Sequence, residues 1–334
     1  GGGTLFATLS GSSMASTALL GTLMVPEMTK RGYKRVLAIG PILGVGGLAI
    51  LIPPSALAVL LGSLARIDVG ALLLAGVVPG LILASLYTIY IVLYLRFDPD
   101  AAPAYDVPEV ALRTKLRLIL SDVLPMGLVV LLVVGSIVMG WATPTESAAC
   151  GVIGVILLAI AYRCLTRAAL VKAFSGATRV AVMMFMIILA SSTFSKVLAF
   201  SGATAGLLES VAGFDLSALA ALLLMFGIML ALGGFMDQLS MMMLTLPIFM
   251  PLAGYYHYNE IWFGVIVLLA LEISLTMPPM GLLLFVMKGV APPGTRLQDI
   301  WVAALPFMAC SVILVACLIA FPNLALWLPE LAVR

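Results

Sequence analysis

The sequence predicts an all-α membrane protein built from two inverted copies of one helical unit. Its 334 residues are 63% hydrophobic and 10% charged, whereas soluble domains are about 45–50% apolar and about 25% charged. Apolar runs long enough to cross a bilayer follow one another along the chain. A set of prolines also recurs at a constant displacement of 225 residues. These three observations exclude a soluble globular chain and a disordered one.

Apolar runs, each separated from the next by a short polar segment, predict the membrane helices in order. They lie at 5–28, 36–65, 69–95, 123–140, 146–165, 178–200, 217–251, 261–290 and 300–321. The gap at 96–122 is rich in proline and basic residues and predicts a surface loop leading into an amphipathic stretch. We therefore expect a first repeat at 1–95, a linker at 96–122, scaffold helices at 123–177, a second repeat at 178–321 and a C-terminal tail at 322–334.

Charge and rare residue types exclude several function classes. With 17 Lys and Arg against 15 Asp and Glu, the net charge of +2 offers no surface for nucleic acid. The cysteines have neither metal-knuckle nor redox spacing, so we interpret Cys150, Cys164, Cys310 and Cys317 as packing residues. The single histidine, His257, lies in an aromatic turn and is interpreted as an interface anchor. We therefore expect no enzyme.

The distribution of basic residues predicts the orientation of the helices. If Lys30, Arg31, Lys34 and Arg35 are cytoplasmic and the runs alternate sides, every basic residue falls inside except Arg66, Lys196 and Arg334. This count works only if the runs 5–28 and 217–251 enter and leave on the same side. Both runs are therefore predicted to be re-entrant hairpins.

The internal repeat places two interrupted segments in each copy. Pro26 and Pro53-Pro54 are matched by Pro251 and Pro278-Pro279 after the same displacement of 225 residues. Proline inside a helix removes a backbone hydrogen bond, so paired prolines within an apolar run predict a broken helix. The turn after Pro26 is inside and the turn after Pro251 is outside by the alternation above, so the copies are inverted. Matched broken segments in inverted halves favour a transporter with its site near the bilayer midplane.

Each predicted hairpin has a short polar tip, and these tips are the candidate sites for binding a substrate or an ion. At the first tip, Ser10-Gly11-Ser12-Ser13 supplies hydroxyls where a helix restarts, and the N-terminus of a helix suits a carboxylate. Unwound carbonyls from Gly46-Gly47 to Pro54 would suit a hard cation such as sodium. The alternative for this tip is that small residues let helices approach closely.

Few acidic residues lie within the apolar runs, and three of them indicate a functional or a structural role. At the second tip, Asp237 is expected to serve the site, because a charged group at the bilayer centre costs at least about 2.5–3.5 kcal/mol. Glu272 precedes the second break and is either a helix-packing anchor or a neighbour of a coupling ion; both readings stay open. Glu146 follows Pro144 and predicts a helix start.

These motifs together resemble the large membrane subunit of TRAP (tripartite ATP-independent periplasmic) transporters. The resemblance extends over essentially the whole chain and rests on the following segments: Ser10-Gly11-Ser12-Ser13-Met14-Ala15, Pro26-Glu27-Met28, Arg31-Gly32-Tyr33, Ile52-Pro53-Pro54-Ser55, Thr143-Pro144-Thr145-Glu146-Ser147-Ala148-Ala149, Phe235-Met236-Asp237, Pro247, Pro251, Pro278-Pro279 and Gly281. The family has further helices ahead of the first hairpin, whereas only nine residues precede Ser10. We therefore expect the chain to be N-terminally incomplete.

The resemblance implies a multi-pass protein of the bacterial inner membrane that imports small organic anions, driven by a sodium gradient. It implies an elevator-type movement of the hairpins and broken helices against a scaffold. The implied partners are a small membrane subunit, a periplasmic substrate-binding protein, the organic anion and membrane lipids, with Na+ as the coupling ion and no nucleic acid. A proton-coupled transporter and a passive anion channel remain alternatives, and an intramembrane enzyme is less favoured.

Candidate site residues follow from the resemblance and from the tip chemistry. Those expected to bind substrate are Ser12, Ser13, Ser55, Asp237 and Gln238, with Pro54 beside them. Those expected around a first sodium ion are Ser10, Gly11, Gly47 and Pro53. Those expected around a second sodium ion are Gly233, Gly234, Thr276 and Gly281.

Overall fold

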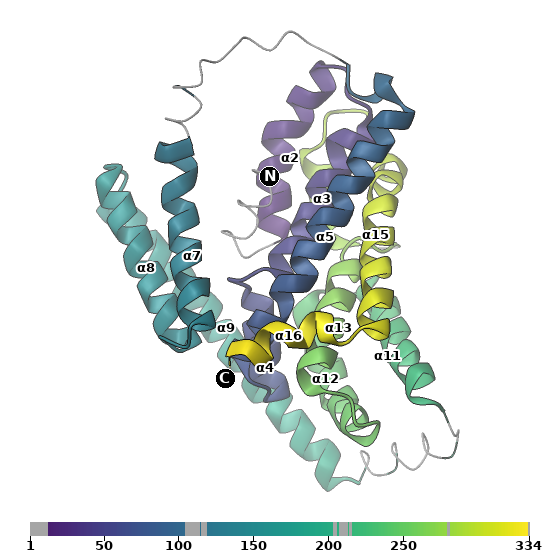
Figure 1. Cartoon of the computed structure of the whole chain (residues 1–334). Helices are drawn as coiled ribbons and strands as arrows, with labels where there is room; N and C mark the ends of the chain where they lie inside the picture. The colour runs from purple at the N-terminus through teal and green to yellow at the C-terminus, as the bar shows by residue number, and fades with distance from the viewer. Residues whose placement is uncertain are drawn as a thin grey trace. The chain divides into compact units, whose positions relative to one another are not determined.

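The computed structural model describes residues 13–103, 119–202, 216–278 and 281–332, together with Thr114, Gly206 and Gly213. In this described part of the chain every regular element is a helix (Figure 1), which confirms the expected all-α class. The helices fall into two compact units, one within Gly1–Ala104 and Ser191–Pro329 and the other within Tyr105–Ala190 and Glu330–Arg334. Each unit is described by itself.

The first unit contains most of both predicted repeats; residues 178–190 of the predicted second repeat belong to the other unit. Its first copy comprises α2 (Ser13–Lys30), α3 (Arg35–Leu51), α4 (Ala56–Ala65), α5 (Val69–Phe97) and the short 3-10 helix η1 (Pro99–Ala101). Its second copy comprises α11 (Ala218–Gly233), α12 (Gln238–Tyr255), α13 (Glu260–Ser274), α14 (Leu282–Val290) and α15 (Leu297–Ala320). The first arm of the first predicted hairpin lies outside the described residues.

The second unit contains the helices that follow the linker. A short π-helix, η2 (Ile119–Val123), leads into α7 (Leu124–Val138), which packs against α8 (Pro144–Ala161). The predicted helix start is confirmed, because Thr143 and Glu146 form a reciprocal capping box with Pro144 at the first helical position. Two further helices, α9 (Arg167–Phe200) and α16 (Asn323–Ala332), continue across the boundary between the units. The expected C-terminal tail thus contains a helix.

Helix boundaries in the first unit repeat with the displacement found in the sequence. The last residues of α2 and α12, Lys30 and Tyr255, are 225 positions apart. The same displacement relates the first residues of α3 and α13, Arg35 and Glu260, and the last residues of α4 and α14. The repeated prolines therefore mark the same structural positions in both copies.

The two copies are inverted relative to one another within this unit. At its start α15 is paired with α3, because Arg35 forms an ion pair with Asp299. Near its end the same helix is bonded to α13, because the indole of Trp262 donates to the carbonyl of Leu318 at 2.8 Å. At about 1.5 Å per residue these contacts are about 28 Å apart, close to the thickness of a hydrocarbon core. The broken helices thus begin at opposite ends of the unit (Figure 1).

The structure describes the first predicted broken helix in full and, of the second, the two helices that flank the break. The first bends by 43° between α3 and α4, where residues 52–55 contain the prolines. The second is interrupted between α13 and α14 over residues 275–281, of which Pro279 and Met280 lie outside the described residues. Most residues of α3 and α13 are buried, so these two helices form the centre of the unit. Helices that are apolar all round require such a covered position.

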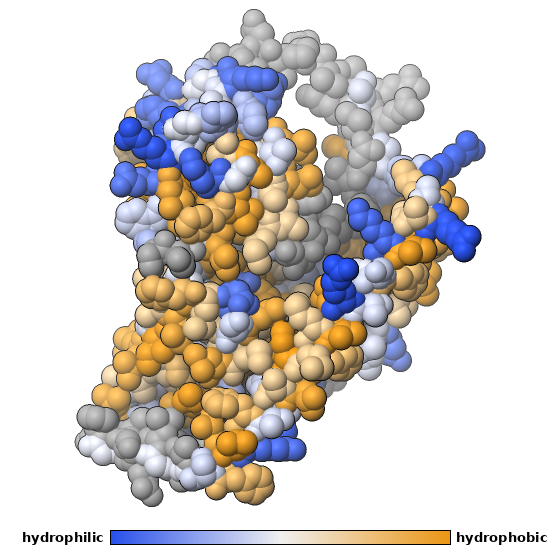
Figure 2. All heavy atoms as spheres, turned by 180° about the vertical axis from the view of Figure 1, so that it is seen from behind, coloured by the Kyte–Doolittle hydropathy of each residue, from blue (hydrophilic) through white to orange (hydrophobic). Residues whose placement is uncertain are grey.

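The described helices are consistent with a protein that crosses a membrane several times. Five are long and apolar enough to do so, or six if the bent pair α3 and α4 counts as one span. Figure 2 shows hydrophilic side chains gathered at the upper left, above a broad apolar band. The start of α3 carries two ion pairs, Lys34–Asp98 and Arg35–Asp299, and the hydrogen bond from Lys34 to Asp98 raises the pKa of the lysine.

Candidate functional site

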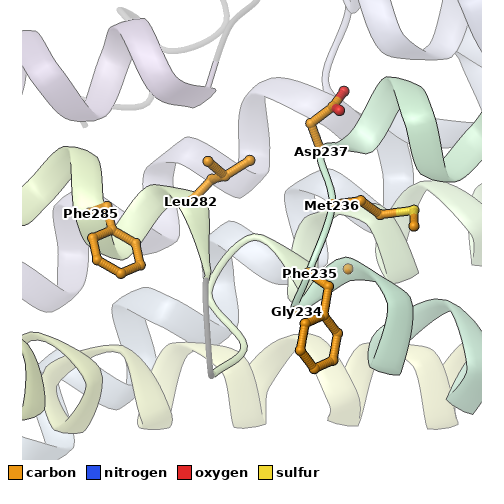
Figure 3. A pocket seen from close by; sticks show the side chains of 7 residues that line it. Gly234, Phe235, Met236, Asp237, Leu282 and Phe285 are labelled. Atoms are coloured by element: carbon orange, nitrogen blue, oxygen red, sulfur yellow. The ribbon is translucent and has the colours of Figure 1, made fainter.

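The second tip forms a cavity beside the second broken helix. The chain leaves α11 at Gly233, turns through residues 234–236 and enters α12 after Asp237. A cavity of about 580 Å³ opens there, lined by Gly233, Gly234, Phe235, Met236, Asp237, Leu282 and Phe285. In Figure 3, Leu282 and Phe285 of α14 lie on one side and the tip lies on the other. Gly233 and Gly234, which were predicted to lie around the second sodium ion, thus line the same cavity as Asp237.

Asp237 is the N-cap of α12. One carboxylate oxygen accepts from the backbone N–H groups of Leu239 and Ser240 at 3.0 and 3.2 Å, and the other accepts from the Ser240 hydroxyl at 2.5 Å. Aspartate is a preferred cap because its carboxylate satisfies otherwise unpaired N–H groups. Among the described residues that line the cavity, Asp237 supplies the one carboxylate, and none is a lysine, arginine or histidine. The cavity is therefore suited to a cation.

The remaining predicted residues of the second copy support the tip and the break. Gln238 is buried and donates from Nε2 to the carbonyl of Leu271 at 3.0 Å, so its amide ties α12 to α13. Thr276 donates to the carbonyl of Ile273 at 3.0 Å. At Gly281 an added Cβ would lie 2.8 and 2.9 Å from the carbonyl oxygens of Leu275 and Met277, so only glycine fits between them.

The first copy presents unpaired hydroxyls at the start of α2. Ser10, Gly11 and Ser12 lie outside the described residues. Ser13 and Thr17 are buried, and neither hydroxyl has a hydrogen-bond partner among the residues that the structure describes. Both side chains lie against Gly46 of α3, where an added Cβ would be 3.2 Å from Thr17 Oγ1 and 3.5 Å from Ser13 Cβ. No acidic residue occupies the first turn of α2.

The first break contains the other predicted residues of this copy. Pro53 is buried, Pro54 is exposed and Ser55 caps α4 by accepting from the N–H of Ala58 at 3.2 Å. Gly47 contacts Glu272 of α13 instead of facing the cavity. No described residue of the first copy lines the cavity at the second tip, so the structure does not join the two predicted half-sites in one pocket.

Several residues around the site were not predicted from the sequence. The apolar lining of the cavity comes from Phe235, Met236, Leu282 and Phe285. Apolar residues abound throughout this chain, so their composition gave no signal. The contact between Gly47 and Glu272 was not predicted either, because the repeat displacement makes these positions equivalent without saying which equivalent positions meet.

Ser55 offers a direct test of whether a capping residue also serves the site. We expect Ser55→Ala to destabilise the protein by about 1 kcal/mol through loss of the cap of α4, and to reduce uptake as well. The matched control is Ser217→Ala, because Ser217 caps α11 with the same bond length of 3.2 Å but is exposed. Thermal unfolding and uptake are measured for both variants. Equal uptake by the two variants would assign Ser55 a capping role alone.

The fold and the site together define a helical membrane protein with inverted repeats and a polar tip at a broken helix. Residues 1–324 match the family model described as the tripartite ATP-independent periplasmic transporter, DctM component. The chain belongs to this family, as the resemblance implied. The family consists of transporter components and not enzymes, which confirms the expectation that the chain is no enzyme.

Curated relatives agree with this family. The chain is 31% identical to the large permease protein of a C4-dicarboxylate TRAP transporter from Pseudomonas aeruginosa, over 98% of this chain and 75% of the relative. It is 26% identical to the large permease protein of an ectoine TRAP transporter from Halomonas elongata, over 99% of this chain and 76% of the relative. It is 27% identical to an isethionate TRAP transporter permease from Oleidesulfovibrio alaskensis, over 91% of this chain and 47% of the relative. The tripartite family implies a small membrane subunit and a periplasmic binding protein as partners.

Proposed function

We propose that this chain is the membrane-embedded large subunit of a sodium-coupled importer of small organic anions in the bacterial inner membrane. The match to the transporter family over residues 1–324 carries the proposal. Relatives are named for C4-dicarboxylate, isethionate and ectoine, which are small compounds that carry a carboxylate or a sulfonate. A periplasmic binding protein delivers the anion, and a small membrane subunit supports the transporting helices.

The second tip is proposed to bind a cation and the first tip to bind the anionic group of the substrate. At the second tip, Asp237 brings a carboxylate to a cavity without a cationic side chain, which supports a sodium ion there together with Gly233, Gly234, Thr276 and Gly281. Oxygen ligands are the ones that a hard cation prefers. Asp237 and Gln238, which are proposed to bind substrate, are then next to this sodium ion.

At the first tip, the start of α2 has two unpaired hydroxyls and no acidic residue in its first turn. The unsatisfied N–H groups of such a helix end attract an anion. Ser12, Ser13 and Ser55 therefore hold the anionic group of the substrate, while Ser10, Gly11, Gly47 and Pro53 are proposed around the first sodium ion.

Movement of the two repeats carries the bound substrate across the membrane. The inverted arrangement of α3 and α13 supports this step, because inverted repeats allow one structure to open alternately to either side. In the proposed elevator movement, re-entrant hairpins at 5–28 and 217–251 and the two broken helices travel together against a scaffold.

Uptake into proteoliposomes tests the proposal. The purified chain is reconstituted with its small subunit and supplied with its binding protein. Labelled C4-dicarboxylate, isethionate and ectoine are offered separately under an inward sodium gradient. We expect at least one of them to accumulate above its external concentration, and accumulation to cease when the sodium gradient is dissipated. Equilibration without accumulation would indicate a passive channel, and accumulation driven by a proton gradient alone would indicate proton coupling.

A further inference from the structure

Residues 271–274 of α13 hold the second tip. The carbonyl of Leu271 accepts from Nε2 of Gln238 at 3.0 Å and from the Ser274 hydroxyl at 2.9 Å. On the same segment, Ser274 lies so close to α11 that a Cβ added at Gly233 would be 2.1 Å from the Ser274 Cβ. Both arms that flank the cavity, α11 and α12, are thus attached to this segment.

Glu272, within the same segment, reaches the first copy of the repeat. Its side chain is 5% exposed, and a Cβ added at Gly47 would lie 2.0 Å from Oε1. The carboxylate therefore lies directly against the backbone of α3, and this contact exists because residue 47 has no side chain. Any larger residue at position 47 would displace Glu272 or separate α3 from α13.

The last long helices of the two copies are joined by a buried hydrogen bond of their own. The hydroxyls of Tyr87 in α5 and Ser311 in α15 are 3.1 Å apart. Among the residues that the structure describes, Oε2 of Glu272 has no hydrogen-bond partner. The position of the Glu272 side chain is therefore set by its packing against α3.

Gly47 and Glu272 are also equivalent positions of the two repeats. They are 225 residues apart, which is the displacement that relates the boundaries of α2 with α12 and of α3 with α13. In a pair of units related by a two-fold axis, a contact between a position and its own equivalent lies on that axis. The Glu272 and Gly47 contact therefore marks the point about which the two copies are arranged.

We propose that Glu272 is a positioning residue that couples the cavity at the second tip to the broken helix of the first repeat. It acts through its shape: the side chain fixes the crossing of α3 and α13, and the adjacent residues Leu271 and Ser274 hold the tip. The inference rests on the proposed function, because the proposed sodium ligands lie on both sides of this contact. A change at position 272 then alters ion binding without touching the cavity.

A double-mutant cycle at positions 47 and 272 tests the coupling. The variants are Gly47→Ala, Glu272→Ala and the double variant, with Glu272→Gln as the conservative change. Gly254→Ala is the matched control, since an added Cβ at this helical glycine meets nothing within 4 Å. Each variant is reconstituted with the small subunit and the binding protein. The unfolding temperature, the maximal uptake rate and the half-saturating sodium concentration are measured.

The expected results separate a positioning role from a purely structural one. Gly47→Ala lowers maximal uptake about tenfold, and adding Glu272→Ala restores it to within about threefold of the Glu272→Ala variant, because the clash is gone. Glu272→Ala raises the half-saturating sodium concentration about fivefold, whereas Glu272→Gln stays within about twofold since it keeps the shape of the side chain. Gly254→Ala behaves as the unmodified protein.

Two outcomes overturn the proposal. One is strict additivity of the Gly47→Ala and Glu272→Ala effects. The other is a Glu272→Ala variant whose unfolding temperature falls while its half-saturating sodium concentration is unchanged, which would show a structural role alone. If the unmodified protein shows no sodium-driven accumulation, the proposed function fails. The coupling is then tested by the double-mutant cycle measured on the unfolding temperature. Non-additive changes in the unfolding temperature support the coupling, and additive changes overturn it.

Discussion

Replacing Asp237 with asparagine is expected to reduce sodium-driven uptake about a hundredfold at low sodium concentration. Asparagine caps a helix about as well as aspartate, so α12 keeps its N-terminal hydrogen bonds and the fold is retained. The cavity, however, loses the carboxylate among its lining residues, and an interaction with a charged group is worth about 1.5–3 kcal/mol, or about tenfold to a hundredfold in affinity. Initial uptake rates over a range of sodium concentrations provide the measurement.

The control for this substitution is Asp68→Asn. Asp68 caps α5 by accepting from the N–H of Ala71 at 2.7 Å, so both variants exchange an aspartate cap for an asparagine cap. Asp68 is absent from the cavity lining, and we expect its variant to keep uptake within about twofold. Excess sodium should partly restore uptake by Asp237→Asn. Full uptake by this variant at low sodium would contradict the placement of a cation at the second tip.

Replacing Gly233 with alanine is expected to cause the second large loss. The added Cβ would lie 2.1 Å from Ser274 Cβ and 2.5 Å from Ser274 Oγ, so α11 must move away from α13. Overpacking of this kind costs about 1–3 kcal/mol. Since Gly233 also lines the cavity, the displacement changes the shape of the site, and we expect uptake to fall about tenfold together with the unfolding temperature.

A glycine on the same helix provides the control. An added Cβ at Gly227 meets nothing within 4 Å, and alanine favours a helix over glycine by about 0.5–1 kcal/mol, so Gly227→Ala should raise the unfolding temperature slightly and leave uptake unchanged. Adding Ser274→Gly to Gly233→Ala removes the clash and should recover much of the uptake. A double variant no better than Gly233→Ala would show that this contact is not the cause of the loss.

The helices and their breaks could be predicted from the sequence to a large extent. The apolar runs predicted the positions of α5, α7 and α15, and the paired prolines predicted the break between α3 and α4. Both signals are local: a run of apolar residues determines which segment leaves water, and proline determines where a backbone hydrogen bond is missing. The sequence missed the helix α16, where it predicted only a tail.

The site could be predicted only in part. Asp237 was singled out because a carboxylate within an apolar run is costly, and it does line the cavity. Gln238 has the same polar character, yet its amide is directed to the carbonyl of Leu271. Leu282 and Phe285 line the cavity although nothing distinguishes them in the sequence from other apolar residues of the chain. Which side chain faces a cavity depends on how separate helices cross, and a linear pattern does not contain that information.

The sequence by itself determined that this is a helical membrane protein with two inverted repeats, because composition, charge distribution and the proline displacement depend only on residue order. Only the tertiary structure decided which equivalent positions meet. Gly47 and Glu272 are placed in contact by the crossing of α3 and α13, and the absence of a side chain at one position makes room for the carboxylate at the other. Close packing of this kind is a property of two helices together, so neither repeat specifies it alone.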